Sequence, residues 1–271
     1  MFTTAKIKER ELISLDGPCP YSCKHCYTYE LDACAENRTI DQLVESLAGK
    51  SFDVVYVSQK RENFVNPDEG IELCRKLFER YGCHIMAITR NVFNPIQKSC
   101  FIDLDKEMTS RGKRLFLGVS LIGLQSAPVS ENMSFAPSPE ERIKFMRDMY
   151  DSGIETLALI RPLFPKEIIP FSEIENIVDF LDGGVSCILS GALMVNDWIL
   201  DRLSIGHHEL DFYENGSSEY LKGALSESVE YVDVRDELRS LKSYCMSKNI
   251  QFFEHSMPAL NYLIEKPSRH Y

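Results

Sequence analysis

Apolar runs with the composition of β-strands alternate along this chain with segments whose apolar residues recur at helical spacing. The expected strands cover residues 11–15, 53–58, 84–89, 114–121, 155–160, 186–193 and 251–254. The expected helices cover residues 39–47, 67–81, 104–111, 138–152, 172–181 and 234–249, and a short helix follows from Pro258. This alternation amounts to six or seven βα units, and repeated right-handed crossovers of this kind build a parallel sheet with helices outside it.

The number of βα units predicts the fold class, because it falls short of the eight that close a full barrel. We therefore expect an α/β fold, an incomplete (βα)6 TIM-like barrel with parallel strands and a C-terminal helix/strand extension. The barrel core is expected in residues 1–195, and residues 196–271 are expected to pack on the barrel and complete it. Within the extension, residues 197–228 are less regular, and Gly206 and the run 215–218 mark loops that suit a lid or an insertion.

The net charge and the apolar pattern of the chain indicate which classes of binding partner to expect. The chain has 271 residues, and 41 acidic against 30 basic residues give a net charge of −11. An acidic surface repels phosphate backbones, so we do not expect nucleic acid as a partner. No apolar run approaches the length that spans a bilayer, so we expect no membrane association. No signal peptide is recognisable, and we expect a cytoplasmic protein.

Three of the nine cysteines stand close together, at Cys19, Cys23 and Cys26. Three thiolates on one short loop can hold three irons of a cubane iron–sulfur cluster, and the fourth iron then remains open to a small molecule. A structural zinc site, which asks for four ligands in paired spacings, is one alternative, and free thiols are another. The remaining cysteines are scattered singly, so the ligand count favours the cluster.

Polar residues follow several expected strands. Parallel sheets place their ligands beyond the carboxyl ends of the strands, so these residues should gather around one site. They are Ser58 and Gln59, Thr89-Arg90-Asn91, Ser120, Arg161, Ser190, and Glu254-His255-Ser256.

The spacing C-x3-C-x2-C, with His25 before the last cysteine and Tyr27 after it, resembles the radical S-adenosylmethionine (radical SAM) enzymes. The resemblance implies that the three cysteines hold a [4Fe-4S] cluster whose open iron is chelated by S-adenosylmethionine. Reductive cleavage of this cofactor then yields a 5′-deoxyadenosyl radical that abstracts a hydrogen from a substrate. An external one-electron reductant of the flavodoxin or ferredoxin type is implied as a partner.

Weaker features are similar to the spore photoproduct lyase-like branch of these enzymes. Ser58, the Thr89-Arg90-Asn91 run and Ser120 match its strand-end positions, and the runs 135–142 and 161–165 also resemble it. Arg90 stands in place of a lysine, however, and the Asp-Pro-Tyr run expected after Ser58 is absent. These departures put an activity on DNA lesions in doubt and leave cofactor binding intact.

The resemblance also suggests roles for single residues. Arg90 offers a charged fork to the cofactor carboxylate. Ser58 and Ser120 would bind the amine or the ribose, unless they only bond nearby backbone. The remaining cofactor candidates are His25 against adenine, Tyr27 at the nucleoside, and Gln59 at the position of a missing Gly-Gly-Glu run. The catalytic candidates are Arg161, Glu254 and His255. Arg161 could reach a carboxylate of the substrate or of the cofactor, or only satisfy nearby carbonyls, and Glu254 and His255 would touch the substrate.

The sequence thus predicts a radical SAM enzyme acting on a small molecule or a peptide, with the reaction class open among lyase, isomerase and transferase. Two alternatives remain. One is a lyase that acts on a nucleic-acid lesion, and the other is a zinc-stabilised binding module without catalysis.

Overall fold

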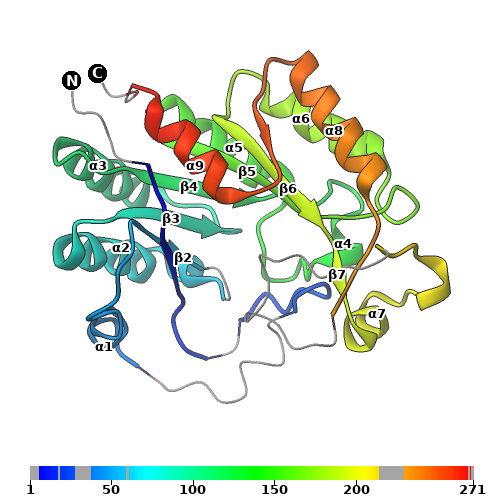
Figure 1. Cartoon of the computed structure of the whole chain (residues 1–271), viewed down its shortest axis with the longest axis horizontal. Helices are drawn as coiled ribbons and strands as arrows, with labels where there is room; N and C mark the ends of the chain where they lie inside the picture. The colour runs from blue at the N-terminus through cyan, green and yellow to red at the C-terminus, as the bar shows by residue number, and fades with distance from the viewer. Residues whose placement is uncertain are drawn as a thin grey trace.

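The computed structural model describes residues 6–17, 19–27, 38–58, 61–213, 229–267 and 269. Its main sheet has seven parallel strands in the order β1-β2-β3-β4-β5-β6-β9 (Figure 1). The strands are β1 (Arg10–Ile13), β2 (Val54–Val57), β3 (His84–Thr89), β4 (Leu115–Ser120), β5 (Glu155–Leu163), β6 (Cys187–Ala192) and β9 (Phe252–Phe253). Because β1 and β9 end this order without pairing to each other, the sheet is an open barrel, and the expected fold class is confirmed.

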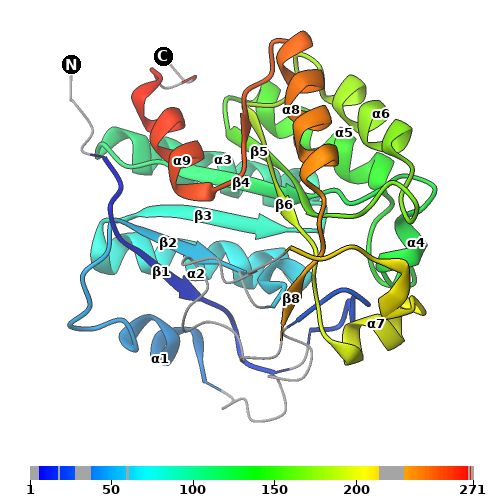
Figure 2. The same cartoon turned by 45° about the vertical axis from the view of Figure 1, so that its right-hand side comes forward.

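Helices other than α4, α7 and α9 cover the outside of the sheet. Figure 2 shows α1, α2 and α3 beside the first strands and α5, α6 and α8 beside the later ones. These helices are α1 (Ile40–Glu45), α2 (Pro67–Tyr81), α3 (Pro95–Ser110), α5 (Pro139–Asp151), α6 (Phe171–Leu181) and α8 (Arg235–Ser247). The remaining elements are the helices α4 (Ala127–Ser130) and α7 (Asp197–Leu203), the 3-10 turns η2 (Asn63–Val65) and η3 (His207–Glu209), and the antiparallel pair β7 (Met194–Val195) and β8 (Glu230–Tyr231). No helix in the described ranges combines the length and the apolar character needed to cross a membrane.

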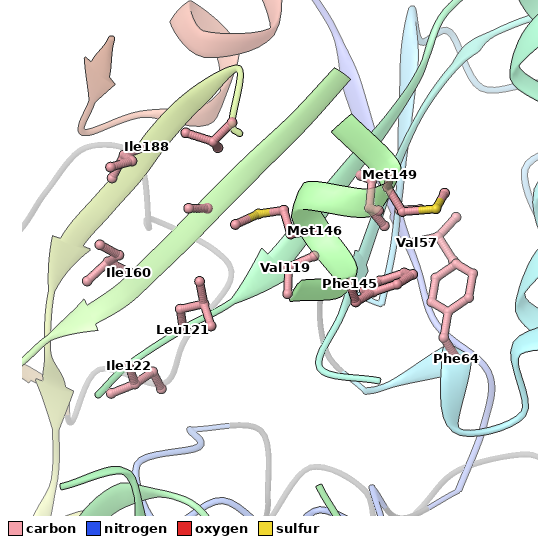
Figure 3. Packing of buried hydrophobic residues seen from close by; sticks show 14 of the residues in the cluster. Val57, Phe64, Val119, Leu121, Ile122, Phe145, Met146, Met149, Ile160 and Ile188 are labelled. Atoms are coloured by element: carbon pink, nitrogen blue, oxygen red, sulfur yellow. The ribbon is translucent and has the colours of Figure 1, made fainter. Parts of the chain in front are cut away.

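The outer face of the sheet carries the larger core. Side chains alternate between the two faces of a strand, and Val119 of β4 and Ile160 of β5 both point outward. Figure 3 shows Phe145, Met146 and Met149 of α5 packed against this face. Strands buried on both faces explain why the sequence shows nearly continuous apolar runs rather than an alternation of apolar and polar residues.

The inner face of the sheet forms a second core with α9 (Ser256–Glu265). Tyr56 of β2 and Leu157 of β5 pack there together with Leu260 and Leu263 of α9. The side chain of Asn261 accepts a hydrogen bond from the backbone N–H of Ile7 at 2.7 Å and donates one to its carbonyl at 3.1 Å. Because α9 covers one part of the inner face, the rest of that face is left to line a cavity.

Most elements lie where the apolar pattern predicts them, and α2 and β3 have the predicted bounds. The helix expected at residues 104–111 is wrong at its start, because α3 begins at Pro95. Asn94 and Gln97 form a reciprocal capping box with Pro95 in the first turn, and this local hydrogen bonding starts the helix although its first turns have few apolar residues. In the segment 197–228, α7 forms after the cap residue Asn196, while the run 215–218 lies outside the described residues. The division at residues 195 and 196 stays a prediction.

Candidate active site

A cavity of about 280 Å³ opens at the carboxyl ends of the strands. Side chains from the first loop, from the ends of β2 to β6 and from the start of α9 line it. They include eleven residues that the sequence predicts for the site: Cys19, Cys23, His25, Cys26, Tyr27, Ser58, Thr89, Arg90, Ser120, Arg161 and Ser256. Its inner wall is apolar and includes Met86, Leu159 and Leu189, so the cavity has a polar, cysteine-rich side and an apolar side.

The segment 19–26, called here the cysteine loop, is a series of tight turns. The N–H of Cys26 donates to the carbonyl of Cys23 at 3.0 Å, and the N–H of Lys24 donates to the carbonyl of Ser130, the last residue of α4, at 2.9 Å. Arg202 of α7 donates to the carbonyl of Cys26 at 2.7 Å. Two segments distant in the sequence thus hold the backbone of the loop, and this leaves its thiols to face the cavity.

The donor set of this loop fits an iron–sulfur cluster. The three cysteines line the same cavity, yet no three His, Cys, Asp or Glu side chains of the described residues converge on a single metal ion. A cubane cluster takes each cysteine on a different iron, so its thiolates stand farther apart than the ligands of one zinc. Burial raises the pKa of the Cys23 thiol to about 11, and the nearby Arg90 charge opposes this. A metal ion bound to the sulfur would favour the thiolate.

Arg90 lies between the cysteine loop and the strand ends. Its guanidinium contacts the Cys23 sulfur, donates to the Ser120 hydroxyl at 3.2 Å and lies 3.3 Å from Nε2 of His25. Its backbone N–H donates to the Glu62 carboxylate at 2.7 Å. These contacts place a permanent positive charge beside the thiols, where it can bind a carboxylate.

A buried ion pair between Glu131 and Arg142 holds the Arg90 side chain in position. The Glu131 carboxylate accepts from Arg142 at 2.6 and 3.2 Å and lies 3.4 Å from Nε of Arg90. Arg142 also donates to the backbone carbonyl of Ser120 at 2.8 Å. Burial acts to raise the pKa of Glu131, but the charges of Arg90 and Arg142 outweigh it and hold that pKa below its usual range. The chain Arg142–Glu131–Arg90 therefore stays ionised and fixes the position of the Arg90 fork.

His25 is held in a neutral state at the edge of the cavity. Its Nδ1 donates to the carbonyl of Ser130 at 3.1 Å, which leaves Nε2 as an acceptor toward Arg90. Burial, assisted by the charge of Arg90, lowers the pKa of His25 to about 3. Its ring also meets Phe164 edge to face. A neutral ring of this kind suits packing and hydrogen bonding rather than proton transfer near neutral pH.

Ser58 illustrates how a strand-end serine can have a structural task. Its hydroxyl accepts a hydrogen bond from the N–H of Asn63 at 2.9 Å, and its backbone adopts a left-handed φ of 76°. The hydroxyl proton remains available for a second bond toward the cavity, which Ser58 lines. Both readings of Ser58 from the sequence are thus compatible with its position.

Two other predicted residues lie away from the cavity, and a third is not described. Glu254 and His255 are exposed and do not line the cavity, whereas the next residue, Ser256, does. Gln59 lies outside the described residues. The strand-end rule failed at β9 because this strand is short and α9 begins immediately after it, so the helix start rather than the loop faces the site.

Five residues around the cavity were not predicted from the sequence. They differ in whether a feature of the sequence could have indicated them. They are Arg10, Glu62, Glu131, Arg142 and Arg202. Arg10 shares the inner face with Leu12 by simple alternation, and Glu62 follows the end of β2, so both had a local signal. Arg142 closes the run 135–142 that carried part of the family resemblance. Glu131 and Arg202 come from short helical segments that the sequence did not predict.

Known proteins match this chain by structure and not by sequence. No family model matches the sequence, and no curated protein matches it. Among solved structures, a variant of spore photoproduct lyase with bound AdoMet and dinucleoside spore photoproduct matches with a TM-score of 0.61 at 12% identity, over 94% of this chain and 79% of that one. Streptococcus suis SuiB bound to S-adenosylmethionine matches with a TM-score of 0.59 at 13% identity, over 98% of this chain and 55% of SuiB. SuiB bound to its precursor peptide SuiA matches with a TM-score of 0.57 at 12% identity, over 98% and 54%.

At these identities the likeness concerns the fold. The chain has the partial-barrel α/β fold of radical SAM enzymes, and the resemblance noted in the sequence, including the weaker one to spore photoproduct lyase, is confirmed at that level. The chain spans about half the length of SuiB and 79% of the matched spore photoproduct lyase chain.

Proposed function

We propose that this protein is a radical SAM enzyme whose cysteine loop holds a [4Fe-4S] cluster and whose cavity takes S-adenosylmethionine and a small-molecule or peptide substrate. The observation that carries the proposal is that the three loop cysteines line one cavity at the carboxyl ends of parallel strands, with the Arg90 fork beside them. The fold shared with spore photoproduct lyase and SuiB supports it.

The residues of the chain have distinct tasks in this proposal. When bound, the cluster and S-adenosylmethionine supply a 5′-deoxyadenosyl radical on one-electron reduction. Arg90 binds the methionyl carboxylate, with Glu131 holding its guanidinium in place. Glu62 and the hydroxyls of Ser58 and Ser120 offer acceptors and donors to the amine and the ribose. The apolar inner wall excludes water from the space in which a hydrogen atom would move.

The partners and the compartment belong to the same proposal. An external one-electron donor of the flavodoxin or ferredoxin type supplies the electron. No two of the described cysteines are joined by a disulfide bond, which suits the reducing cytoplasm.

Anaerobic reconstitution with iron and sulfide tests the proposal. We expect broad visible absorbance from the cluster and, with S-adenosylmethionine and a strong reductant, formation of 5′-deoxyadenosine. Replacement of Cys19, Cys23 and Cys26 by Ala should abolish both while the far-ultraviolet circular dichroism is retained. Cys100→Ala is the matched control, because Cys100 is an exposed cysteine on α3 away from the cavity. Persistence of 5′-deoxyadenosine in the triple variant would show that the cysteine loop is not the site.

The second candidate is a lyase that acts on a nucleic-acid lesion. The match to spore photoproduct lyase with its bound dinucleoside favours it, whereas the net charge of −11 opposes contact with long nucleic acid. Binding to DNA that weakens steeply with salt would support this candidate, and no binding at low salt would eliminate it. A zinc-stabilised module would instead retain zinc alone, without iron–sulfur absorbance.

A further inference from the structure

The side of the cavity next to α9 contains two arginines that the proposed cofactor site does not use. Arg10 lies at the start of β1 and Arg161 near the end of β5, and both line the cavity. We propose that Arg10 and Arg161 together bind an oxyanion, a carboxylate or a phosphate group, on the substrate. The inference rests on the proposed function, because it names the substrate class of the same cavity.

The fold aims Arg161 into the cavity. Leu157 and Leu159 of β5 face inward, and Arg161 continues this alternation. The pairing of β5 with β6 shifts register between Ile160 and Leu163, and the buried hydroxyl of Ser190 donates to the carbonyl of Ile160 at 2.7 Å. Such irregularities often direct a side chain at a functional site.

Gly191 provides the space for the Arg161 guanidinium. A Cβ atom at residue 191 would lie 3.1 Å from Nε and 3.2 Å from the central carbon of the guanidinium. The guanidinium thus rests against the bare backbone of β6. Within the described part of the chain, no carboxylate forms an ion pair with Arg161, although its side chain is open to solvent in the cavity. Desolvation by the surrounding protein lowers its pKa, as does the nearby charge of Arg10 to a smaller extent.

Arg10 is fixed by neutral groups. Its guanidinium donates to the Ser256 hydroxyl at 3.2 Å and lies 5.5 Å from the centre of the Tyr56 ring. Among the residues that the structure describes, no carboxylate pairs with it. Ser256 is the first residue of α9, and no side chain caps that helix start. Ser256 also lines the cavity, and the N–H groups of a first helical turn favour a nearby anion.

Each of the other charged side chains of the cavity has an opposite charge nearby. Among the residues that the structure describes, four arginines, Arg10, Arg61, Arg90 and Arg161, and one carboxylate, Glu62, line the cavity. Glu62 accepts backbone N–H groups from Phe64 and Arg90, and Arg90 is paired with Glu131. Arg61 lies near Asp16, whose pKa is lowered chiefly by its hydrogen bond from Arg38 and in smaller part by Arg61.

Arg10 and Arg161 therefore remain as two neighbouring like charges whose mutual repulsion an anion would relieve. An acidic protein that keeps two such cations in a cavity concentrates small anions there rather than over its whole surface. Bidentate guanidinium forks match both carboxylate and phosphate oxygens.

Calorimetric titration of the reconstituted full-length protein with bound S-adenosylmethionine, without reductant and in low-chloride buffer, tests the inference. The probes are glutarate, inorganic phosphate and the neutral diamide glutaramide. We expect glutarate or phosphate to bind and glutaramide not to bind. A preference for glutarate assigns a carboxylate to the substrate, and a preference for phosphate assigns a phosphoryl group.

The variants are Arg161→Gln and Arg10→Gln, with Arg75→Gln as the control, since Arg75 pairs with Glu107 on the outer helices. Loss of one charged donor should weaken anion binding about 10- to 100-fold. Arg161→Lys should weaken it less than Arg161→Gln. Gly191→Ala should weaken it with both arginines present, because the added methyl displaces the guanidinium.

Equal binding of glutaramide, or unchanged anion binding in both glutamine variants, would overturn the inference. An equal loss of affinity for S-adenosylmethionine in these variants would also overturn it, because the arginines would then serve the cofactor. The proposed function fails separately, by absence of 5′-deoxyadenosine from a protein that still binds anions through Arg161.

Discussion

Removing the charge of Glu131 is the sharpest perturbation that the structure offers. This carboxylate is 2% exposed and lies between two guanidinium groups, those of Arg142 and Arg90. The substitution Glu131→Gln keeps the shape and removes the negative charge. Arg142, which is fully buried, would then carry a positive charge with only the carbonyl of Ser120 and one amide oxygen to accept its protons.

The magnitude follows from this burial. Breaking a buried ion pair from one side costs about 3–5 kcal/mol, because the remaining charge stays desolvated. A domain of ordinary stability unfolds with about 5–15 kcal/mol, so the variant should lose a large share of its stability. The loss should also free the Arg90 fork, and we expect weaker binding of S-adenosylmethionine in addition to the loss of stability.

Urea unfolding under anaerobic, reducing conditions measures the effect, first on the cluster-free chain, where a single transition is easier to obtain. The double variant Glu131→Leu/Arg142→Met should recover much of the stability, because it removes the fully buried charge of Arg142 together with that of Glu131. Only Arg90, which lines the cavity, then lacks its carboxylate partner. Glu107→Gln, at an exposed pair with Arg111, is the control and should cost less than about 1 kcal/mol.

The pH dependence has a defined sign. The pKa of Glu131 is lower in the folded protein than its ordinary value of 4.5. Its contribution to stability is therefore fully present above pH 4.5 and disappears as the pH falls through the folded-state pKa. The difference between wild type and Glu131→Gln should shrink in that range. A cost below about 1 kcal/mol at pH 7, or no recovery in the double variant, would refute the reasoning.

Three further predictions concern other parts of the fold. Burial lowers the pKa of His84 to about 4, so the free energy of unfolding of the wild type should fall by on the order of 3 kcal/mol between pH 6.5 and pH 4. The variant His84→Gln should lose less stability over this range, and equal pH slopes of the two proteins in urea unfolding would contradict the prediction. Gly70→Ala should destabilise by about 1–3 kcal/mol in thermal or urea unfolding, because its methyl would overlap the buried ring of Phe64 in a core without free space; a more stable variant would show that α2 shifts freely. The variant Arg202→Met should release iron to a chelator about tenfold faster than the control Arg75→Met, since it removes the hydrogen-bond donor to the carbonyl of Cys26 in the cysteine loop. An unchanged release rate would show that Arg202 does not hold the loop around the metal.

The sequence alone determined the order of strands and helices. Strands buried on both faces leave long apolar runs, and caps such as Ser138 with Glu141 in α5 mark the helix starts through local hydrogen bonds. The spacing of the cysteines likewise pointed to a cluster, because ligand spacing on one loop is a local property. The positions of Arg90 and Arg161 followed from the rule that strand ends in a parallel sheet converge.

Only the tertiary structure decided what surrounds these residues. Glu131 meets Arg90 across 41 positions of sequence, and Arg202 reaches the cysteine loop from α7; no periodicity encodes such contacts. Because α9 packs on the inner face of the sheet, Ser256, rather than Glu254 or His255, faces the cavity. Burial and charge balance depend on which segments meet in space, so the sequence indicated the cluster chemistry, while the fold singled out two arginines without carboxylate partners in the described residues.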